Sequence, residues 1–283
     1  MYSEVAGLVG SMNKKHRAFL KWAGGKYSLC DVISKMLPNE RRLIEPFVGA
    51  GSVFLNTDYD EYILNDINKD LINLYKIIQV QPDSFIEDAR KFFNPEHNQA
   101  ETYYQLRSDF NASKDSYFRS LVFLYMNRHG YNGLCRYNKK GGYNVPFGKY
   151  KRPYFPELEL NYFAEKSQKA TFVCEGYRQA FERAEKGDVI YCDPPYVPLS
   201  KTASFTSYAG NGFGLDEQAD LANAAEEVSE NGTVSVVISN HDTIWTRKIY
   251  EHANKIKSVK VARTISQSAN KRKKVAELLA LYK

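Results

Sequence analysis

The chain has 283 residues, of which 43% are hydrophobic and 25% are charged, and its formal net charge is +6. This composition is ordinary for a soluble globular protein, and no apolar run approaches the length of a membrane-spanning helix, which excludes a membrane protein. The four cysteines lie far apart without a Cys-x-x-Cys pair and the five histidines show no ligand spacing, which argues against a metal site and fits a reducing cytoplasm.

The N-terminus, "MYSEVAGLVGSM", lacks the cationic start and the apolar core of a signal peptide. Its composition differs from that of the basic stretch that follows Met12. We therefore expect translation in the cell to begin at Met12, with residues 1–11 forming a disordered extension. An intact mass of the natively expressed protein that starts at Met1 would contradict this expectation.

The first motif is "FLKWAGGKY", residues 19–27, in which Lys21 and Lys26 bracket Trp22 and a Gly-Gly pair. Such a loop can lay an aromatic ring against a ligand and place a cation near the ligand's carboxylate. It can equally be a surface turn with two solvated lysines, and the stretch alone leaves both interpretations open.

Residues 41–56, "RRLIEPFVGAGSVFLN", predict a strand, a glycine turn and then a helix. Gly49 and Gly51 allow a ligand to approach the backbone closely, and a helix start is polar and positive. The position three past Gly51 is Phe54, so the dinucleotide fingerprint is incomplete, which argues against NAD. A purely structural tight turn remains an alternative.

Residues 61–78, "EYILNDINKDLINLYKII", predict a strand that ends at Asp66, followed by a helix. A carboxylate at this place can accept hydrogen bonds from both hydroxyls of a ribose. A helix N-cap is the alternative role for Asp66.

The alternation of strands and helices stops between about 79 and 176. That stretch is rich in aromatic and basic residues, has helical character near 101–127, and ends in a predicted hairpin, "CRYNKKGGYNVPF", that turns at Gly141 and Gly142. We interpret residues 79–176 as a domain inserted into a sheet domain formed by 12–78 and 177–283.

Within the insert, residues 125–154 interleave six tyrosines with seven Lys or Arg. Cations neutralise phosphates and tyrosines stack on bases, so this pattern predicts nucleic-acid binding. Asn127, Asn132, Asn138 and Asn144 add base-reading chemistry at expected turn positions. Several of these tyrosines could instead be core, and Asn at turns also has a conformational explanation. Lys and Arg also cluster at 14–26, 128–152 and 271–274, which suggests a polyanionic partner, although the net charge alone favours a solvated surface.

The next strand runs into "DVIYCDPPY" and stops at Asp193. Pro194 lacks a backbone donor and Pro195 restricts Pro194 to extended geometry, so the tip is rigid. It carries a carboxylate, the Pro194 carbonyl and the ring of Tyr196. Asp-Pro alone often begins a turn, but that does not explain the second proline and the tyrosine.

This tip suits the exocyclic amine of an adenine or cytosine that has been flipped out of a duplex. The Asp193 carboxylate and the Pro194 carbonyl would accept both amine protons, which directs the nitrogen lone pair toward an electrophile and stabilises the developing positive charge. Tyr196 would stack on the base. The electrophile would be the methyl group of S-adenosylmethionine, which fits a glycine loop with a ribose-binding acid, and no metal is required.

A helical stretch, "LDEQADLANAAEEVSEN", and a strand at 233–242 complete the alternation. The sequence therefore predicts an α/β fold: a doubly wound, mainly parallel, Rossmann-like methyltransferase sheet with an inserted, mainly helical target-recognition domain that carries a β-hairpin. Ligands of such sheets bind beyond the carboxyl ends of the strands, where all these loops fall.

From about residue 16 to 283 the chain resembles the Dam-type DNA adenine N6-methyltransferases, bacterial enzymes that act at GATC. The motif order "KWAGGK", "EPFVGAG", insert, "DPPY" matches that family. "DPPY" is shared with other amino methyltransferases, whereas "NRHGYNGLCRYN" followed by "NVPFG" is far more specific.

The resemblance implies roles for individual residues. Asp193, Pro194 and Tyr196 would be catalytic. S-adenosylmethionine would be bound by Trp22, Lys26, Phe47, Gly49, Gly51, Asp66 and Asp193. Lys21 and Tyr150 would read the outer guanine, Leu134, Arg136 and Pro146 the later base pairs, and Tyr131 and Asn132 would fill the gap left by the flipped base. Asn138 would contact the DNA backbone, and the set of DNA-binding residues is completed by Arg107, Arg128 and Lys151.

Two positions depart from the family pattern. Lys149 stands where relatives can carry Arg, which would keep a phosphate contact but not a bidentate one. Ser268, Ala269 and Asn270 stand where relatives often have Asn-Gly-Gly, which puts the flexibility of that loop in question.

Three other functions compete with duplex GATC methylation: cytosine N4 or RNA adenine methylation, a DNA-binding module without turnover, and an NAD oxidoreductase. The insert argues against the first, the intact "DPPY" against the second, and the missing third glycine against the third. We expect a monomer in the bacterial cytoplasm, associated with the nucleoid. The resemblance leaves mismatch repair, replication timing and gene regulation open as cellular roles.

Overall fold

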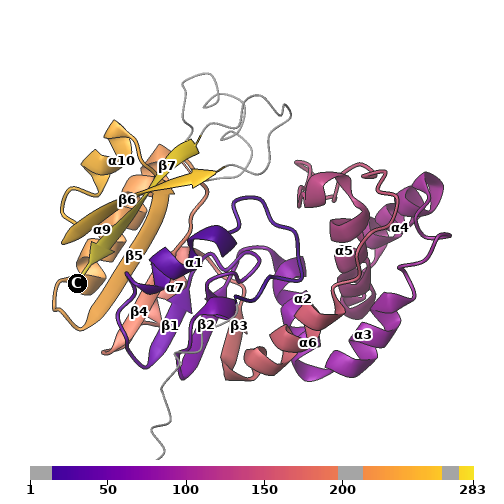
Figure 1. The fold of residues 1–283 in the computed structure, drawn as a ribbon, viewed down its shortest axis with the longest axis horizontal. Helices are drawn as coiled ribbons and strands as arrows, with labels where there is room; N and C mark the ends of the chain where they lie inside the picture. The colour runs from indigo at the N-terminus through magenta and orange to yellow at the C-terminus, as the bar shows by residue number, and fades with distance from the viewer. Residues whose placement is uncertain (1–14, 197–212, 263–273) are drawn as a thin grey trace, which may run out of the picture.

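A seven-stranded sheet organises the computed structural model, which describes residues 15–196, 213–262 and 274–283. Its strand order is β3-β2-β1-β4-β5-β7-β6 (Figure 1). The first five strands in this order pair in parallel, and β7 pairs antiparallel with both β5 and β6. The strands are β1 (Arg42–Glu45), β2 (Glu61–Asn65), β3 (Ala170–Val173), β4 (Asp188–Cys192), β5 (Val234–His241), β6 (Lys255–Ala262) and β7 (Lys274–Tyr282). The predicted doubly wound, mainly parallel sheet is confirmed, whereas the sequence analysis did not predict the β6–β7 pair.

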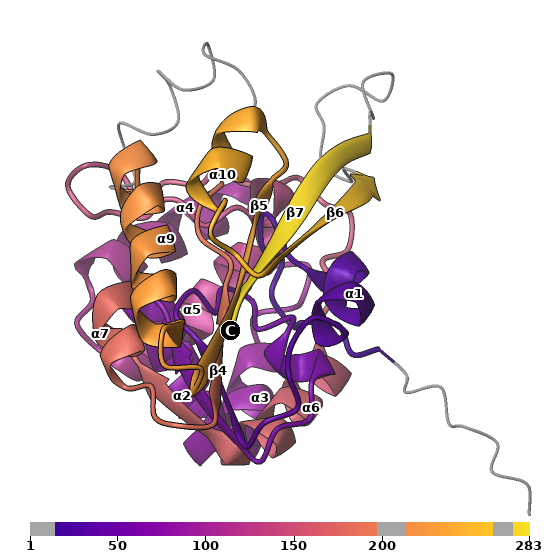
Figure 2. The same cartoon turned by 90° about the vertical axis from the view of Figure 1, so that its left-hand side faces the viewer.

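The central strands are apolar because both of their faces are covered. Every residue of β4 is buried, including Asp188, whose carboxylate accepts two hydrogen bonds from Arg42, from Nε at 3.0 Å and from Nη2 at 2.6 Å. Alternate residues of β4 face opposite cores: Val189 packs in one hydrophobic cluster and Ile190 in the other. The helices α9 (Leu215–Ser229) and α1 (Cys30–Ser34) lie on opposite sides of the sheet (Figure 2).

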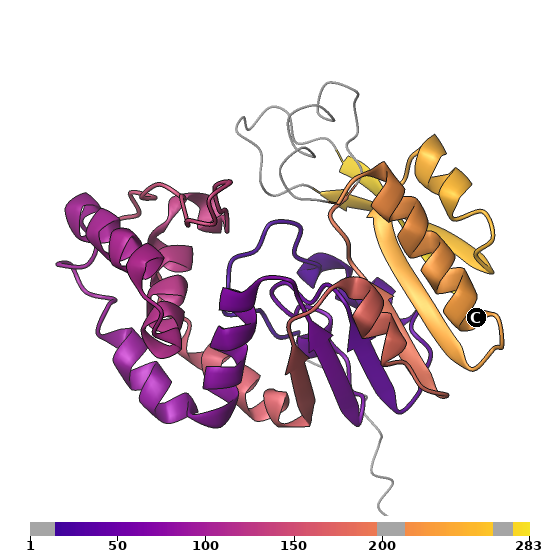
Figure 3. The ribbon, with the colours of Figure 1, turned by 180° about the vertical axis from the view of Figure 1, so that it is seen from behind.

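The insert is a group of helices at the β3 end of the sheet (Figures 1 and 3). α2 (Lys69–Val80) lies between them and the sheet, and the predicted helical character near 101–127 is confirmed by α4 (Ala100–Ala112) and α5 (Ser116–His129). One continuous hydrophobic cluster includes sheet residues such as Leu43 and insert residues such as Phe123, so the two parts share a core. No described helix is both long and apolar enough to cross a membrane. The remaining helices are α3 (Pro82–Arg90), α6 (Glu157–Lys166), α7 (Tyr177–Glu182) and α10 (Ile244–Ile249).

One local prediction is wrong. The helix expected after the glycine turn is only a 3₁₀ turn, Phe54–Asn56, because β2 begins at Glu61 and leaves the chain too few residues. The predicted hairpin is short: an antiparallel bridge joins Tyr137 and Tyr143, and beside it the Asn138 N–H donates to the Gly142 carbonyl at 2.8 Å and the Asn144 N–H to the Arg136 carbonyl at 3.0 Å. The Tyr143 backbone N–H and carbonyl, which face away from Tyr137, bond to the side chain of Asn111 in α4, at 2.7 and 3.1 Å.

The division into a sheet domain and an insert stays a prediction. β3 lies within the range 79–176 of the predicted insert, yet it pairs with β2 in the sheet. The predicted extension at 1–11 and the departure at Ser268, Ala269 and Asn270 fall outside the described residues.

Candidate active site

The glycine loop lies between the carboxyl ends of β1 and β2. Gly49 has φ +47° and Gly51 has φ +72°, backbone conformations that favour glycine. The Gly49 carbonyl accepts a hydrogen bond from the Tyr75 hydroxyl at 2.5 Å, and the neighbouring Val48 N–H donates to the Asn65 carbonyl at 2.8 Å. These contacts hold the loop against β2 and α2.

Asp66 joins the glycine loop to the start of α2. Its Oδ2 accepts the Gly49 N–H at 3.1 Å and its Oδ1 accepts the Asn68 N–H at 2.9 Å. Burial raises the pKa of Asp66, and the two N–H bonds oppose that rise. The helix N-cap is Asn68, whose Oδ1 accepts from Asp70 and Leu71, so the N-cap alternative for Asp66 is wrong.

Trp22 covers the glycine loop from the N-terminal side. A Cβ added at Gly49 would lie 2.9 Å from Trp22 Nε1, so the indole packs directly on this backbone. Phe47, which lies between β1 and Gly49, stacks on Tyr177 with ring centroids 5.6 Å apart. Ile67, next to Asp66, is 81% exposed.

Asp193 follows β4 and lies in a polar cluster. Its Oδ1 lies 2.9 Å from Lys26 Nζ and accepts a hydrogen bond from Ser239 Oγ at 3.0 Å. Lys26 also donates to the Gly24 carbonyl at 2.7 Å. Ser239 comes from the neighbouring strand β5, is fully buried, and also accepts from the Tyr191 hydroxyl. The sequence analysis did not find Ser239, because it lies in an apolar strand.

Tyr196 lies beside the same cluster. The Lys26 ammonium lies 4.5 Å from the centroid of its ring, and His241 meets the ring edge-on at 4.8 Å. The Tyr196 hydroxyl donates to Glu277 Oε2 at 2.9 Å. The buried Gln218 donates through Nε2 to the Pro195 carbonyl. The side chains that surround the tip therefore come from the loop of Lys26 and from α9, β5 and β7.

The loop from Trp22 to Lys26 connects the two halves of the site, because Trp22 contacts Gly49 and Lys26 contacts Asp193. A second carboxyl group, Glu45, is buried nearby. Burial and the negative charge of Asp193 raise its pKa well above the ordinary 4.5, and its Oε1 has no partner among the described residues. The described residues include no group of three or more side chains that could hold a metal ion.

Three of the predicted DNA-binding residues meet on one surface. Lys21 Nζ lies 4.2 Å from the centroid of the Tyr150 ring, and the Asn132 N–H donates to the Tyr150 hydroxyl at 3.0 Å. Burial and the charge of Arg128 lower the pKa of Lys21. Asn127, expected at a turn, instead lies in α5 with 1% exposure and bonds to both backbone groups of Lys21. Its expected base-reading role is therefore wrong.

The predicted base-reading residues of the hairpin region lie on two neighbouring backbone segments. The carbonyl of Leu134 accepts the Tyr143 hydroxyl at 2.8 Å, and the Tyr131 N–H donates to the Pro146 carbonyl at 2.8 Å. The exposed Arg136 donates through Nε to Asn144 Oδ1 at 2.7 Å.

Asn138 shapes the turn. Its Oδ1 accepts the N–H groups of Lys140 and Gly142 at 2.9 and 3.0 Å. The conformational role of an asparagine at a turn is therefore observed here.

Arg107 and Arg128 hold backbone carbonyls in this structure. Arg107 Nη1 donates to the Val145 carbonyl at 2.9 Å. Arg128 is only 8% exposed and donates to the carbonyls of Tyr154 and Phe19, and burial lowers its pKa. Lys151, by contrast, is exposed.

Comparison with known proteins gives one consistent result. The profile described as "D12 class N6 adenine-specific DNA methyltransferase" matches residues 22–265. The DNA adenine methylase of Vibrio cholerae serotype O1 is 61% identical over 269 residues, which cover 95% of this chain and 97% of that protein. The DNA adenine methylases of Escherichia coli strain K12 and Serratia marcescens are 58% and 59% identical over 270 residues, covering 95% of this chain and 96% and 100% of those proteins.

Proposed function

The chain belongs to the D12 class of N6 adenine-specific DNA methyltransferases, and we propose that it methylates the adenine of GATC in duplex DNA with S-adenosylmethionine as donor. The observation that carries the proposal is the junction of two motifs at one edge of the sheet. There the loop from Trp22 to Lys26 connects the glycine loop and Asp66 with Asp193 and Tyr196.

The residues at the glycine loop fit S-adenosylmethionine. The cofactor, when bound, supplies a methyl group as electrophile. A Cβ at Gly49 would close the space against Trp22, and the carboxylate of Asp66, which is held by two N–H groups, can accept ribose hydroxyls. Gly51, Phe47, Lys26 and Asp193 complete the proposed cofactor site.

Asp193 would orient the adenine amine. The contacts described above fix its Oδ1, and this leaves Oδ2 to accept an amine proton. The Pro194 carbonyl would accept the second proton, so that the nitrogen lone pair points at the methyl group for direct in-line attack. Tyr196, held by Glu277, would stack on the base. The base reaches this pocket only if it is flipped out of the duplex.

The DNA would lie across the surface formed by Lys21, Tyr150 and Asn132. Lys21 and Tyr150 would read the outer guanine, and Leu134, Arg136 and Pro146 the later base pairs, while Tyr131 and Asn132 fill the gap of the flipped base. Asn138, Arg107, Arg128 and Lys151 would support or contact the phosphate backbone. Identities of 58–61% to bacterial DNA adenine methylases support this assignment.

We further propose that the protein acts as a monomer on chromosomal DNA in the bacterial cytoplasm. The mildly basic chain, with a net charge of +6, suits a polyanionic substrate. Mismatch repair, replication timing and gene regulation are the cellular roles that such methylation can serve.

The test is transfer of labelled methyl from S-adenosylmethionine to two short duplexes, one with GATC and one in which that adenine is replaced. Label only in the GATC duplex is the expected result. Equal label in both duplexes would contradict GATC as the target sequence but would still agree with methyl transfer to DNA. A third substrate, single-stranded RNA of the same sequence, separates DNA from RNA methylation. Label in none of them, with DNA binding intact, would favour a binding module without turnover.

A further inference from the structure

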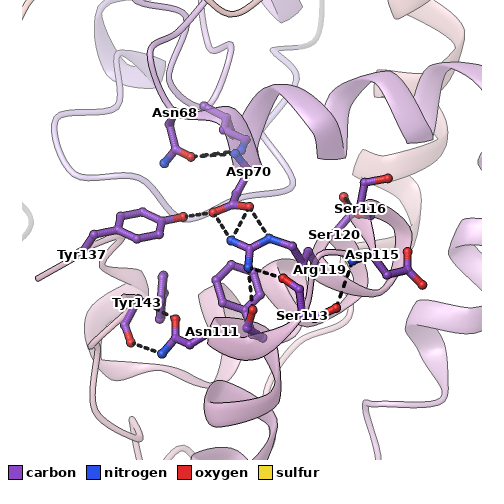
Figure 4. Close-up of polar contacts among 12 residues, drawn as sticks. Asn68, Asp70, Asn111, Ser113, Asp115, Ser116, Arg119, Ser120, Tyr137 and Tyr143 are labelled. Atoms are coloured by element: carbon purple, nitrogen blue, oxygen red, sulfur yellow. Dashed lines mark hydrogen bonds and ion pairs between the residues drawn. The ribbon is translucent and has the colours of Figure 1, made fainter. Parts of the chain in front are cut away.

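Asp70, in the first turn of α2, is bonded to two segments that are distant in sequence (Figure 4). Its carboxylate accepts from Arg119 of α5, Nε to Oδ1 at 2.9 Å and Nη2 to Oδ2 at 2.8 Å, and from the Tyr137 hydroxyl to Oδ2 at 2.7 Å. The side chains of Asp70 and Arg119 are 12% and 21% exposed. Charge-assisted hydrogen bonds that are shielded from water in this way are geometrically restrictive.

Tyr137 belongs to the segment 134–138, which we name the recognition loop. Its residues alternate: Cys135 and Tyr137 are half-buried, whereas Arg136 and Asn138 are exposed. The inward pair bonds to the start of α2, because Cys135 Sγ accepts from Asn68 Nδ2 at 3.4 Å and Tyr137 donates to Asp70. The exposed side chains are those with proposed DNA contacts.

The same turn of α2 is bonded to the proposed cofactor site. The Asn68 Oδ1 accepts the Asp70 N–H at 3.1 Å, and the Asn68 N–H donates to Asp66, which also accepts the Gly49 N–H. A continuous series of hydrogen bonds therefore runs from the recognition loop to the glycine loop.

We propose that Asp70 is a positioning residue that fixes the recognition loop relative to the cofactor site and thereby contributes to discrimination of the target sequence. The inference rests on the proposed function. Arg119 holds the Asp70 carboxylate in one orientation, and this carboxylate fixes Tyr137. Because Arg136 precedes Tyr137 in the chain, the orientation of the Arg136 side chain depends on Asp70. Without this hydrogen bond the recognition loop would discriminate less between GATC and other sequences.

The mildest test is Tyr137→Phe, which keeps the packed ring and removes the bond to Asp70. Tyr117→Phe is the matched control, because the Tyr117 hydroxyl also donates to an aspartate, Asp88 Oδ2 at 2.8 Å, in a part of the insert away from the recognition loop. The readout is the ratio of kcat/KM for GATC to kcat/KM for duplexes with one changed base pair. Affinity for S-adenosylmethionine is measured in parallel.

Tyr137→Phe should lower this ratio by about 3- to 10-fold, the usual net size of one lost hydrogen bond, with cofactor affinity within about twofold. Tyr117→Phe should leave the ratio unchanged. Asp70→Asn, which also disturbs Arg119, should lower it further, provided its circular dichroism matches the wild type.

The outcomes separate the two proposals. A wild-type ratio near one would overturn the GATC assignment and the inference with it. A high wild-type ratio that Tyr137→Phe leaves within twofold would overturn the role of Asp70 alone. An equal fall in Tyr137→Phe and Tyr117→Phe would likewise overturn it, because the effect would then be a general loss of stability.

Discussion

The ammonium of Lys26 lies 2.9 Å from Oδ1 of Asp193, with side chains only 6% and 22% exposed. Ser239 donates to the same oxygen at 3.0 Å. Two donors on one oxygen hold the carboxylate plane in place before any base arrives, and such preorganisation lowers the cost of orienting a substrate amine. This geometry supports the proposed catalytic role of Asp193.

We expect Asp193→Ala to reduce methyl transfer by about 10²- to 10³-fold or more, because it removes an acceptor that acts mainly in the transition state. DNA affinity should stay within a few-fold of the wild type. Single-turnover methyl transfer and equilibrium DNA binding measure the two quantities. Asp58→Asn is the control, since the 88% exposed Asp58 also pairs with a lysine, Lys169, but lies on the surface. Full activity in Asp193→Ala would exclude the proposed mechanism.

Gly49→Ala should weaken binding of S-adenosylmethionine. The φ of +47° already strains a residue with a side chain, and the added Cβ would meet Trp22 Nε1 at 2.9 Å. Displacing the indole should raise the Kd by about tenfold, the equivalent of about 1.4 kcal/mol. Isothermal titration with the cofactor measures it.

Gly141→Ala is the control for backbone strain, because Gly141 has φ +80° but a Cβ there meets nothing within 4 Å. That variant should lose some stability and keep its cofactor affinity. If both variants bound the cofactor equally well, Trp22 and Gly49 would not line the cofactor site.

The sequence predicted the ends of the strands well. Asp66 and Asp193 each follow an apolar run directly, and a parallel sheet places such residues at one edge, so their shared position at that edge could be predicted from the sequence. Gly49 could be predicted as well, since glycine after a strand indicates a turn whose backbone conformation other residues rarely adopt.

The partners of these residues could not be predicted in the same way. Ser239 and His241 lie on β5, and Glu277 lies on β7, where they form part of strands with mainly apolar residues. Their position beside Asp193 and Tyr196 depends on the order of strands in the sheet, in which β5 lies next to β4 and β7 is placed antiparallel beside β5.

Arg136→Ala should relax discrimination at one base pair by about 1–3 kcal/mol, the usual value of a good base contact. Methylation of the four variants of that base pair gives the measurement. Since Arg136 Nε donates to Asn144 Oδ1 at 2.7 Å, the variant also frees Asn144. Asn144→Ala therefore serves as control, and it should relax discrimination less. A uniform loss at all sequences would instead identify Arg136 as a phosphate contact.

His129 at the end of α5 gives the stability of the protein a specific pH dependence. Its Nδ1 donates to the Tyr125 carbonyl at 3.0 Å, whereas its Nε2 is buried without a partner among the described residues. Protonation would place an unpaired charge in the core, and burial accordingly lowers the pKa of His129 from 6.5 to about 4. The ring packs between Tyr125 and Phe93, with centroids at 4.1 and 4.9 Å.

Because the folded pKa is depressed, the unfolded chain binds more protons between pH 6.5 and about 4. The contribution of neutral His129 to stability is thus complete above pH 6.5 and is lost as the pH falls toward 4, by up to about 1.4 kcal/mol per pH unit.

His129→Phe keeps an aromatic ring in the core and cannot titrate. Its free energy of unfolding relative to the wild type should therefore rise by roughly 3 kcal/mol between pH 7.5 and pH 4. Urea unfolding at several pH values measures this difference. His252→Gln is the control: Glu226 raises the pKa of this exposed histidine, so its small effect has the opposite sign. Parallel curves for His129→Phe and the wild type would show that His129 titrates normally.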